Sequence, residues 1–249
     1  MPLNLRRRAA VADPAVRYQL PPSAEEQAIL ARARPLTMTS EARLLAVIDA
    51  VTHLVRRDIP GALVECGVWK GGSVVAMLMR LLQLGVTDRE VYLYDTFEGM
   101  TAPTAADTSA FEAPALTTWN QALAAGRRAW QQLFAESSFS EAGVREALAA
   151  TGYPMARVHL VRGPVELTLP AQAPGPIALL RLDTDWYEST RHELEQLYPA
   201  LSAGGVLIVD DYGHWEGCRR AVDEYFARPG MAPLLLQRTD YTGRMAVKA

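Results

Sequence analysis

Short apolar segments alternate along this chain with longer segments of helical periodicity, and this alternation constrains the fold more than any other feature. The apolar segments typical of buried strands are residues 62–66, 91–94, 158–161, 177–182 and 206–209. Helical spacing is found in residues 41–54, 73–84, 188–198 and 218–227. Strands that alternate with helices in this way predict a doubly wound α/β fold, in which helices cover both faces of a parallel sheet.

Three regions depart from this alternation. Residues 1–36 contain several prolines and mixed charge, and we expect an N-terminal arm with short helical pieces. Residues 103–150 are rich in alanine and too long for a loop, so we expect a mainly helical insertion. An insertion that follows a strand end lies on the ligand side of such a sheet, the acceptor side. The arm and the insertion could each cover the substrate as a lid or pack against another subunit. Residues 233–238 and 245–248 predict a closing antiparallel hairpin, and residues 199–205 predict a turn before the last parallel strand.

Composition excludes several classes of function. The 249 residues carry 25 basic and 28 acidic side chains, so the net charge of −3 favours neither nucleic acid nor an anionic membrane as a partner. The single basic run, Arg6 to Arg8, is too short to change this conclusion. No uncharged apolar stretch reaches the roughly 18 residues of a membrane span. Two cysteines cannot form a disulfide scaffold. We therefore expect one cytoplasmic domain over residues 1–249.

Acidic residues stand where four of the predicted strands end, which is the edge of an open parallel sheet where ligands bind. Glu65 comes just before a turn with three glycines that lacks the Gly-x-Gly-x-x-Gly spacing. An acidic residue there favours a ligand with a positive charge, such as an amino group or a sulfonium; a helix-packing turn is the alternative. Asp95 stands where nucleotide-binding folds keep a carboxylate for ribose hydroxyls, and an N-cap or an Asx turn is its alternative.

Three further carboxylates, Asp183, Asp210 and Asp211, end two strands whose tips lie roughly 5 Å apart if the strands are neighbours. Carboxylates at that distance repel unless a cation or protons compensate. Oxygen ligands without a histidine or cysteine cluster favour Mg²⁺, with Mn²⁺ or Ca²⁺ as substitutes. The alternative is that one aspartate caps a helix and another meets an arginine. Asp185 follows on the same loop and suits a general base, or else forms a turn.

The remaining candidates carry weaker signals. His159 lies within a predicted strand, which is typical of a core histidine with a satisfied hydrogen bond. His214 follows the last acidic strand end and could enter the ligand crevice. Cys66, at the end of an apolar strand, is interpreted as a small hydrophobic residue. Neither a Gly-x-Ser-x-Gly elbow nor a Walker A loop is present.

Several blocks of the sequence, taken in order, resemble the macrocin O-methyltransferase family of enzymes that use S-adenosylmethionine (SAM). The blocks are Thr37–Ser40, Pro60–Ser73, Tyr94–Met100, Gly152–Pro154, Gly163–Glu166, Leu182–Thr190 and Asp210–Tyr212. The resemblance implies a class I methyltransferase fold, Rossmann-like, with seven strands of which the last is antiparallel. It also implies a homodimer or a higher homo-oligomer, because family members often form dimers.

The resemblance also assigns roles to residues of this chain. SAM is expected to contact the residues that match the family's cofactor-binding blocks: Met38, Thr39, Ser40, Glu65, Gly67, Val68, Gly72, Ser73, Asp95, Thr96, Phe97 and Val165. Asp183, Asp210 and Asp211 match the family's Mg²⁺ ligands, and Asp185 matches a carboxylate proposed as the base in sugar-modifying members. Some members use a histidine from the variable region instead. This chain has no histidine between residues 54 and 158, which gives Asp185 more weight.

The resulting hypothesis is a Mg²⁺-dependent O-methyltransferase of antibiotic biosynthesis. Its acceptor is the hydroxyl of a deoxysugar on a glycosylated natural product; the metal chelates two neighbouring acceptor oxygens, and Asp185 is the base. A second hypothesis keeps the chemistry but takes a catechol or another non-sugar vicinal diol as the acceptor. Two further hypotheses are an NAD-dependent oxidoreductase, against which the absent glycine fingerprint counts, and a non-catalytic binding protein.

Overall fold

The computed structural model describes residues 21–135 and 139–249, and within them the strands form one seven-stranded sheet in the order β3-β2-β1-β4-β5-β7-β6. The parallel strands are β1 (Ala62–Cys66), β2 (Val91–Asp95), β3 (Val158–Arg162), β4 (Ile177–Leu182) and β5 (Leu201–Val209). β6 (Gln237–Arg238) and β7 (Arg244–Val247) pair as the antiparallel hairpin that closes the sheet. The predicted strand content and the closing hairpin are confirmed.

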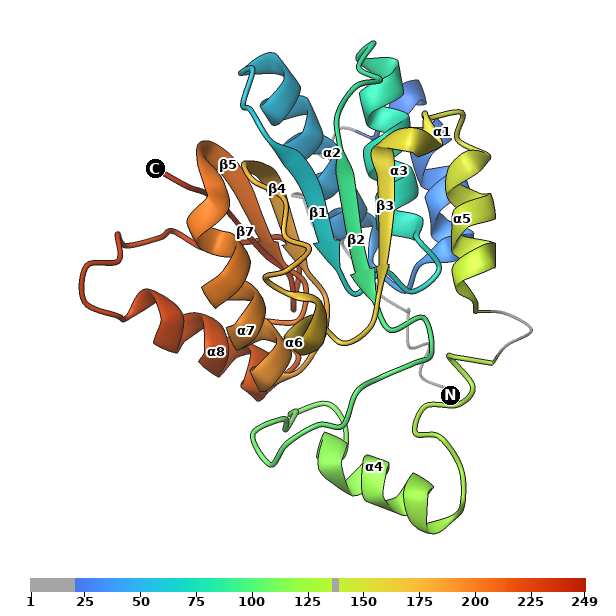
Figure 1. The fold of residues 1–249 in the computed structure, drawn as a ribbon, viewed down its shortest axis with the longest axis vertical. Coiled ribbons are helices and arrows are strands. Elements are labelled where there is room, and N and C mark those ends of the chain that lie inside the picture. The colour runs from blue at the N-terminus through green and yellow to red at the C-terminus, as the bar shows by residue number, and fades with distance from the viewer. Residues whose placement is uncertain (1–20, 136–138) are drawn as a thin grey trace, which may run out of the picture.

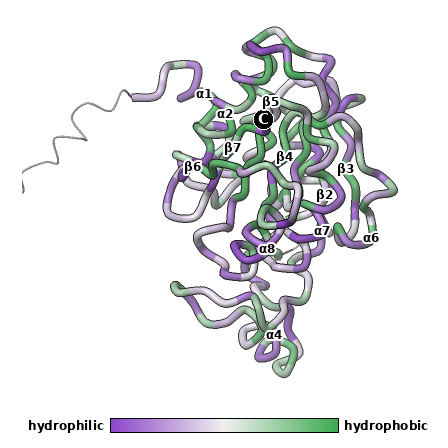
Figure 2. The backbone as a smooth tube through the Cα atoms, turned by 90° about the vertical axis from the view of Figure 1, so that its left-hand side faces the viewer, coloured by the Kyte–Doolittle hydropathy of each residue, from purple (hydrophilic) through white to green (hydrophobic). Residues whose placement is uncertain are grey.

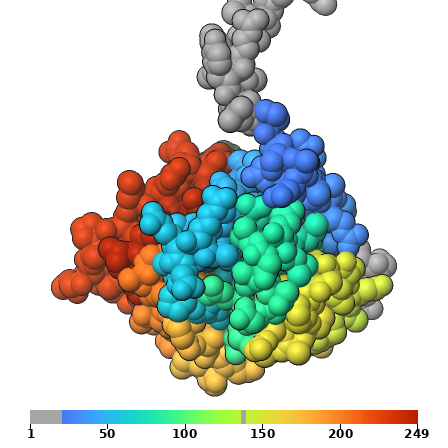
Figure 3. Space-filling model, turned by 90° about the horizontal axis from the view of Figure 1, so that it is seen from above, coloured from blue at the N-terminus to red at the C-terminus, as the bar shows by residue number. Residues whose placement is uncertain are grey.

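Helices cover both faces of this sheet (Figure 1). One layer contains α1 (Ala24–Ala33), α2 (Glu41–Arg56), α3 (Gly72–Gln83) and α5 (Glu141–Ala149), and the other contains α6 (Val165–Thr168), α7 (Tyr187–Leu197) and α8 (Glu216–Phe226). Short 3₁₀ turns lie at Arg34–Leu36, Met155–Arg157 and Tyr198–Ala200. Seen from the end opposite α4, the N-terminal part of the chain, in blue to yellow, and the C-terminal part, in orange to red, occupy neighbouring regions of the surface (Figure 3).

Each central strand is buried on both faces, so its residues alternate between two hydrophobic cores. In β1, Leu63 packs into the core beneath α2 and α3, whereas Val64 packs into the core beneath α7 and α8. This is why the central strands read as continuous apolar runs rather than as an alternation of apolar and polar residues. The apolar colouring of Figure 2 is accordingly concentrated in the inner strands.

Three local expectations are wrong. Residues 103–150 are not mainly helical, because the described part of this insertion forms helices only at Ala115–Ala124 and Glu141–Ala149 and is otherwise mostly turns and irregular chain. The segment 199–205 is not a turn throughout, because β5 already begins at Leu201 and passes through Gly204, which has a φ of 76°, with an irregular register against β4. His159 is not a core residue, because β3 is the edge strand of the sheet. Its side chain is 40% exposed, pairs with Glu90 and stacks on Tyr92.

The arm and the insertion each contribute a helix to the core. Residues 1–20, which include Arg6 to Arg8, lie outside the described residues, whereas α1 buries Ile29 and Leu30 against α3. In the insertion, α5 belongs to the helical layer, where Val144 and Leu148 are buried. The segment around α4 (Ala115–Ala124) instead projects beyond the carboxyl ends of the strands (Figures 1 and 2).

Candidate functional site

A cavity of about 460 Å³ opens at the carboxyl ends of the parallel strands. This size falls in the range of small-molecule and cofactor sites. Most residues singled out in the sequence line it: Met38, Thr39, Glu65, Gly67, Val68, Ser73, Asp95, Thr96, Val165, Asp183, Asp185, Asp210 and Asp211. The topology therefore brings residues from both ends of the chain to one place.

Three of the residues expected at the cofactor support the cavity without lining it. Ser40 is the N-cap of α2, where its hydroxyl accepts from the Arg43 amide and donates to Asp240. Gly72 lies against the segment before α2, and a Cβ there would stand 2.6 Å from the Cβ of Thr37. Phe97 has a φ of 52° and a buried ring in the core beneath α3.

The loop after β1 is held by the carboxylate of Asp95. Its Oδ2 accepts from the amides of Val68 at 2.7 Å and Trp69 at 3.0 Å, and its Oδ1 accepts from the amide of Phe97 at 2.8 Å. Burial raises the pKa of Asp95, while these amides lower it. The Thr96 hydroxyl lies 3.5 Å from the same Oδ1. The Asx turn that was the alternative is present, and a ribose contact stays a prediction.

Gly67 is required by a close approach between two loops. Its φ is 81°, and a Cβ at this position would stand 1.9 Å from the carbonyl oxygen of Asp183. Any other residue would push the loop after β1 away from the loop after β4. The glycine thus brings the expected cofactor loop against the expected metal ligands.

Asp183, Asp210 and Asp211 lie together because β4 and β5 are neighbours in the sheet, as the sequence predicted conditionally. One oxygen of each carboxylate lies within 4.8 Å of one oxygen of each of the others. Burial raises the pKa of Asp183 to about 6 and that of Asp211 well above its ordinary value, with neighbouring carboxylates adding to both. Oδ2 of Asp211 is buried without a hydrogen-bond partner in the described part of the chain.

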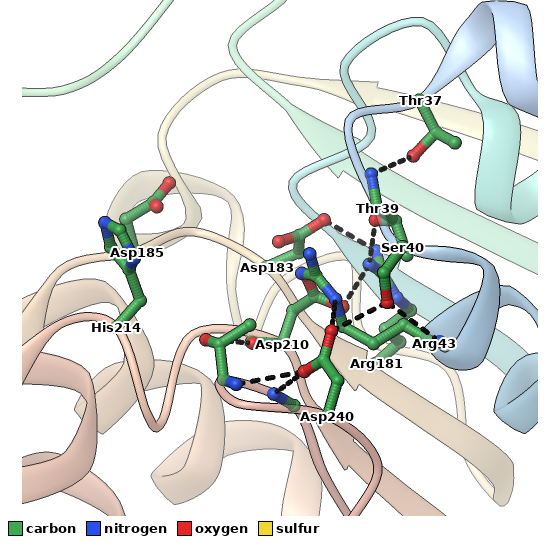
Figure 4. Close-up of polar contacts among 12 residues, drawn as sticks. Thr37, Thr39, Ser40, Arg43, Arg181, Asp183, Asp185, Asp210, His214 and Asp240 are labelled. Atoms are coloured by element: carbon green, nitrogen blue, oxygen red, sulfur yellow. Dashed lines mark hydrogen bonds and ion pairs between the residues drawn. The ribbon is translucent and has the colours of Figure 1, made fainter. Parts of the chain in front are cut away.

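Two arginines missed by the sequence analysis join this group, as the dashed lines of Figure 4 show. Arg181 is fully buried in β4, and its Nη1 donates to Glu65 and Asp183, both at 2.7 Å. Its Nη2 donates to Asp210 at 2.5 Å and to Thr39 at 3.2 Å. Arg43, from α2, pairs with Asp210 and Asp240. The signal that could have revealed Arg181 is a single charge in an otherwise apolar buried strand.

Glu65 therefore meets a positive charge that belongs to the protein. It is paired in register with Arg181 on the neighbouring strand, and its Oε2 has no partner in the described structure. Burial raises the pKa of Glu65 to about 8, although Arg181 opposes the shift. An internal ion pair was not among the alternatives considered for Glu65, and contact with a ligand sulfonium stays a prediction.

Asp185 has a left-handed backbone, with a φ of 66°, and lines the same cavity. The indole Nε1 of Trp215 donates to its Oδ1 at 2.9 Å. Burial, together with the charge of Asp183, raises the pKa of Asp185 well above its ordinary value. The side chain is thus placed where a general base would be useful, at the edge of the acidic cluster.

At the mouth of the cavity, the start of the insertion contacts the C-terminal loops. His214, which lines the cavity, pairs with Glu112 at 2.8 Å and lies 3.1 Å from the hydroxyl of Tyr241. Phe111 stacks on the His214 ring. The sequence placed His214 near the crevice, and the structure confirms that position; a contact with substrate stays a prediction.

Asp107, which the sequence analysis missed, anchors the insertion. It is fully buried, and its carboxylate accepts from the amide of Tyr187 at 2.7 Å, at the start of α7, and from the amide of Thr104 at 2.6 Å. Gly217 leaves the space for it, because a Cβ there would stand 2.0 Å from Oδ1 of Asp107. An aspartate inside an irregular segment gave no signal that distinguishes it from a solvated one.

The strand order, the cavity at the carboxyl ends and the glycine turn followed by an acidic residue after β2 define a class I methyltransferase fold. Among solved structures, the O-methyltransferase NovP aligns with a TM-score of 0.71 at 32% identity, covering 86% of this chain and 82% of that one. The calicheamicin methyltransferase CalS11 aligns with a TM-score of 0.62 at 20% identity, covering 97% and 99%, and supports the fold alone.

The model of the macrocin-O-methyltransferase family matches residues 19–245, so the chain belongs to this family and is a SAM-dependent O-methyltransferase. The demethyldecarbamoylnovobiocin O-methyltransferase of Streptomyces niveus is 34% identical over 80% of this chain and 71% of its own length. A rhamnosyl-tetracenomycin-C 4'-O-methyltransferase of Streptomyces olivaceus is 35% identical over 79% and 69%. Within the described residues, no helix has the length and apolar character of a membrane span.

Proposed function

We propose that this enzyme methylates a hydroxyl of a sugar, preferably a deoxysugar, on a glycosylated natural product in a Mg²⁺-dependent reaction. The observation that carries the proposal is that Asp185 and the cluster of Asp183, Asp210 and Asp211 share one cavity with the loop after β1. The relative from Streptomyces olivaceus is named for methylation at a rhamnosyl-bearing tetracenomycin, which supports a sugar acceptor.

The donor side of the cavity would be formed by the loops after β1, β2 and β3. Asp95 would accept from a ribose hydroxyl through its Oδ1, and Val165, at the start of α6, would contact the adenine. Met38 is 57% exposed beside the cavity and would cover the donor from the N-terminal side. Each role requires only atoms that already face the cavity.

The acidic cluster fits a divalent cation. Its donors are carboxylate oxygens, the ligands that Mg²⁺ prefers, and Asp211 brings a buried oxygen that lacks a partner. Asp183, Asp210 and Asp211 would hold the ion, which when bound would orient two neighbouring acceptor oxygens and lower the pKa of the reacting hydroxyl. Arg181 pairs with Asp183 and Asp210, and Arg43 pairs with Asp210, so both carboxylates would be held in place by the protein's own side chains.

Asp185 would remove the proton that the acceptor hydroxyl loses during methyl transfer. Lowering the pKa of that hydroxyl lowers the barrier by at most about 1.4 kcal/mol for each unit. Correct positioning of two reactants can contribute about 7–11 kcal/mol. We therefore expect the acidic cluster and Asp185 to act mainly by fixing the acceptor in line with the methyl group.

The test is a methylation assay with SAM, Mg²⁺ and two acceptors, 4-nitrophenyl α-L-rhamnopyranoside and 3,4-dihydroxybenzoate, analysed by mass spectrometry. We expect methylation of the rhamnoside, loss of turnover in excess EDTA and recovery when Mg²⁺ is restored. Methylation of the catechol alone would overturn the sugar assignment. Full activity in EDTA after metal-free purification would overturn the metal assignment.

A further inference from the structure

Trp215 donates the hydrogen bond that Asp185 receives. Its Nε1 lies 2.9 Å from Oδ1 of Asp185, and among the described residues no second hydrogen bond reaches this carboxylate. Hydrogen bonds to a charged group are stronger than neutral ones, so this contact has a large influence on where the carboxylate points. No part of the reaction proposed above uses the indole.

The indole is itself rigidly held. Trp215 is 5% exposed and is the N-cap residue of α8, where its amide donates to the carbonyl of Asp211 at 3.0 Å. Its ring packs edge-to-face between Trp186, at 5.0 Å, and His214, at 5.1 Å. The N–H direction is therefore fixed by packing on both sides.

Asp185 lacks comparable support of its own. Its backbone is left-handed and belongs to the connection between β4 and α7, so neither a strand nor a helix orients its side chain. A carboxylate in such a loop can rotate about its side-chain bonds unless a partner stops it. Trp215 is the partner that the fold supplies.

We propose that Trp215 is a positioning residue for methyl transfer, whose indole N–H holds the Asp185 carboxylate in the direction from which it takes the proton of the acceptor. The proposal rests on the role of Asp185 proposed above. It deepens that role by assigning the orientation of the base to a specific side chain on a different element of the fold.

Trp215→Phe tests this by removing the N–H while keeping an aromatic ring. With 4-nitrophenyl α-L-rhamnopyranoside as acceptor, we expect kcat to fall about 10- to 100-fold, as for the loss of supporting hydrogen bonds in other sites. The KM for the acceptor and the affinity for S-adenosylhomocysteine (SAH), the demethylated product of SAM, should change by less than about twofold. Rates are divided by the concentration of SAH-binding sites from calorimetry, so that partial unfolding does not lower them. Trp215→Tyr gives a second removal of the indole if the phenylalanine variant is unstable.

Trp186→Phe is the matched control, because its indole belongs to the same aromatic cluster but donates to the carbonyl of Thr101. We expect a smaller loss of kcat than for Trp215→Phe. Equal losses in the two variants would show that the cluster matters only for packing, and would overturn the proposal.

A double-mutant cycle separates a positioning role from a structural one. If Trp215 acts through Asp185, adding Trp215→Phe to Asp185→Asn should lower the residual kcat by less than about twofold. Multiplication of the two single losses would overturn the proposal. Loss of turnover in Asp185→Asn with wild-type kcat in Trp215→Phe would overturn the Trp215 role alone. Wild-type kcat in Asp185→Asn would overturn the assignment of the base, and the role of Trp215 with it.

Discussion

The two sides of the cavity use carboxylates at strand ends in opposite ways. On the β2 side, Asp95 accepts three backbone N–H groups, so its charge is satisfied by the loops that it organises. On the β4 and β5 side, Asp183 and Asp210 pair with Arg181 and Arg43, whereas Oδ2 of Asp211 is buried without a hydrogen-bond partner among the described residues. We call the β2 side the complete side, because its aspartate has its hydrogen-bond partners. We call the β4 and β5 side the incomplete side, because one of its aspartates lacks a partner for one oxygen.

This difference indicates which kind of ligand group each side of the cavity can bind. A satisfied carboxylate is already in the position it needs for a neutral hydroxyl, because it can accept one more hydrogen bond without rearrangement. An unsatisfied buried carboxylate has an energetic cost that a proton, a cation or a hydrogen-bond donor removes, and in a cluster of carboxylates a cation also relieves their mutual repulsion. The comparison therefore supports the proposal that the nucleoside part of the donor binds on the β2 side and the cation on the β4 and β5 side.

The largest expected effect comes from Asp183→Asn, which changes the acidic cluster of the incomplete side. It removes one negative charge and one ligand oxygen from the cluster, and we expect turnover to fall below detection while the affinity for SAH changes by less than about threefold. The assay pairs steady-state kinetics with calorimetry of SAH. Strongly reduced SAH binding in this variant would contradict the division of the cavity into two sides.

The substitution Arg181→Met tests whether the stability of the incomplete side depends on the buried guanidinium of Arg181. Removing one partner of a buried ion pair typically costs about 3–5 kcal/mol, because the opposing charges lose their compensation. We expect a fall of this size in the free energy of unfolding, measured by urea denaturation. The control is Arg191→Met, because Arg191 pairs with Glu188 on the surface; exposed pairs contribute about 0–1 kcal/mol. Similar losses in the two variants would rule out the burial argument.

Asp95→Ala breaks the complete side. Three amides lose a charged acceptor, and the predicted ribose contact is lost as well. Hydrogen bonds to a charged group contribute about 1.5–3 kcal/mol, so the affinity for SAH should fall by about 10-fold or more. Binding of Mn²⁺, measured by its paramagnetic resonance, should remain unchanged. A variant that loses Mn²⁺ instead of SAH would reverse the assignment of the two sides.

Asp107→Ala gives the smallest expected effect, because Asp107 contacts neither side directly. It fixes the insertion on the amino end of α7, because its carboxylate accepts from the amide of Tyr187. We expect a rise of a few-fold in the KM for the acceptor, with the affinity for SAH unchanged. Limited proteolysis should cleave the segment 104–114 faster than in the wild type. An unchanged KM together with unchanged proteolysis would show that the anchor has no influence on the site.

Much of the fold follows from local pattern. Runs such as residues 177–182 are apolar because both faces of a central parallel strand are buried, and the alternation with helices then leaves few topologies. The predictions are wrong where the position of a segment in the sheet overrides its local sequence pattern. His159 has apolar neighbours in the sequence but lies on the edge strand. Gly204 and Gly205 would favour a turn in isolation, but β5 continues through both.

The site divides in the same way. The sequence by itself determined that Asp95, Asp183, Asp210 and Asp211 gather at one edge, because strand ends of a parallel sheet share that edge. Only the tertiary structure decided their partners. Arg43 and Asp210 are separated by 167 residues, and Trp215 and Asp185 by 30, so no local spacing predicts either contact. Strand order brings such residues together. Whether the oxygens of a buried carboxylate have hydrogen-bond or ion-pair partners therefore depends on these long-range neighbours.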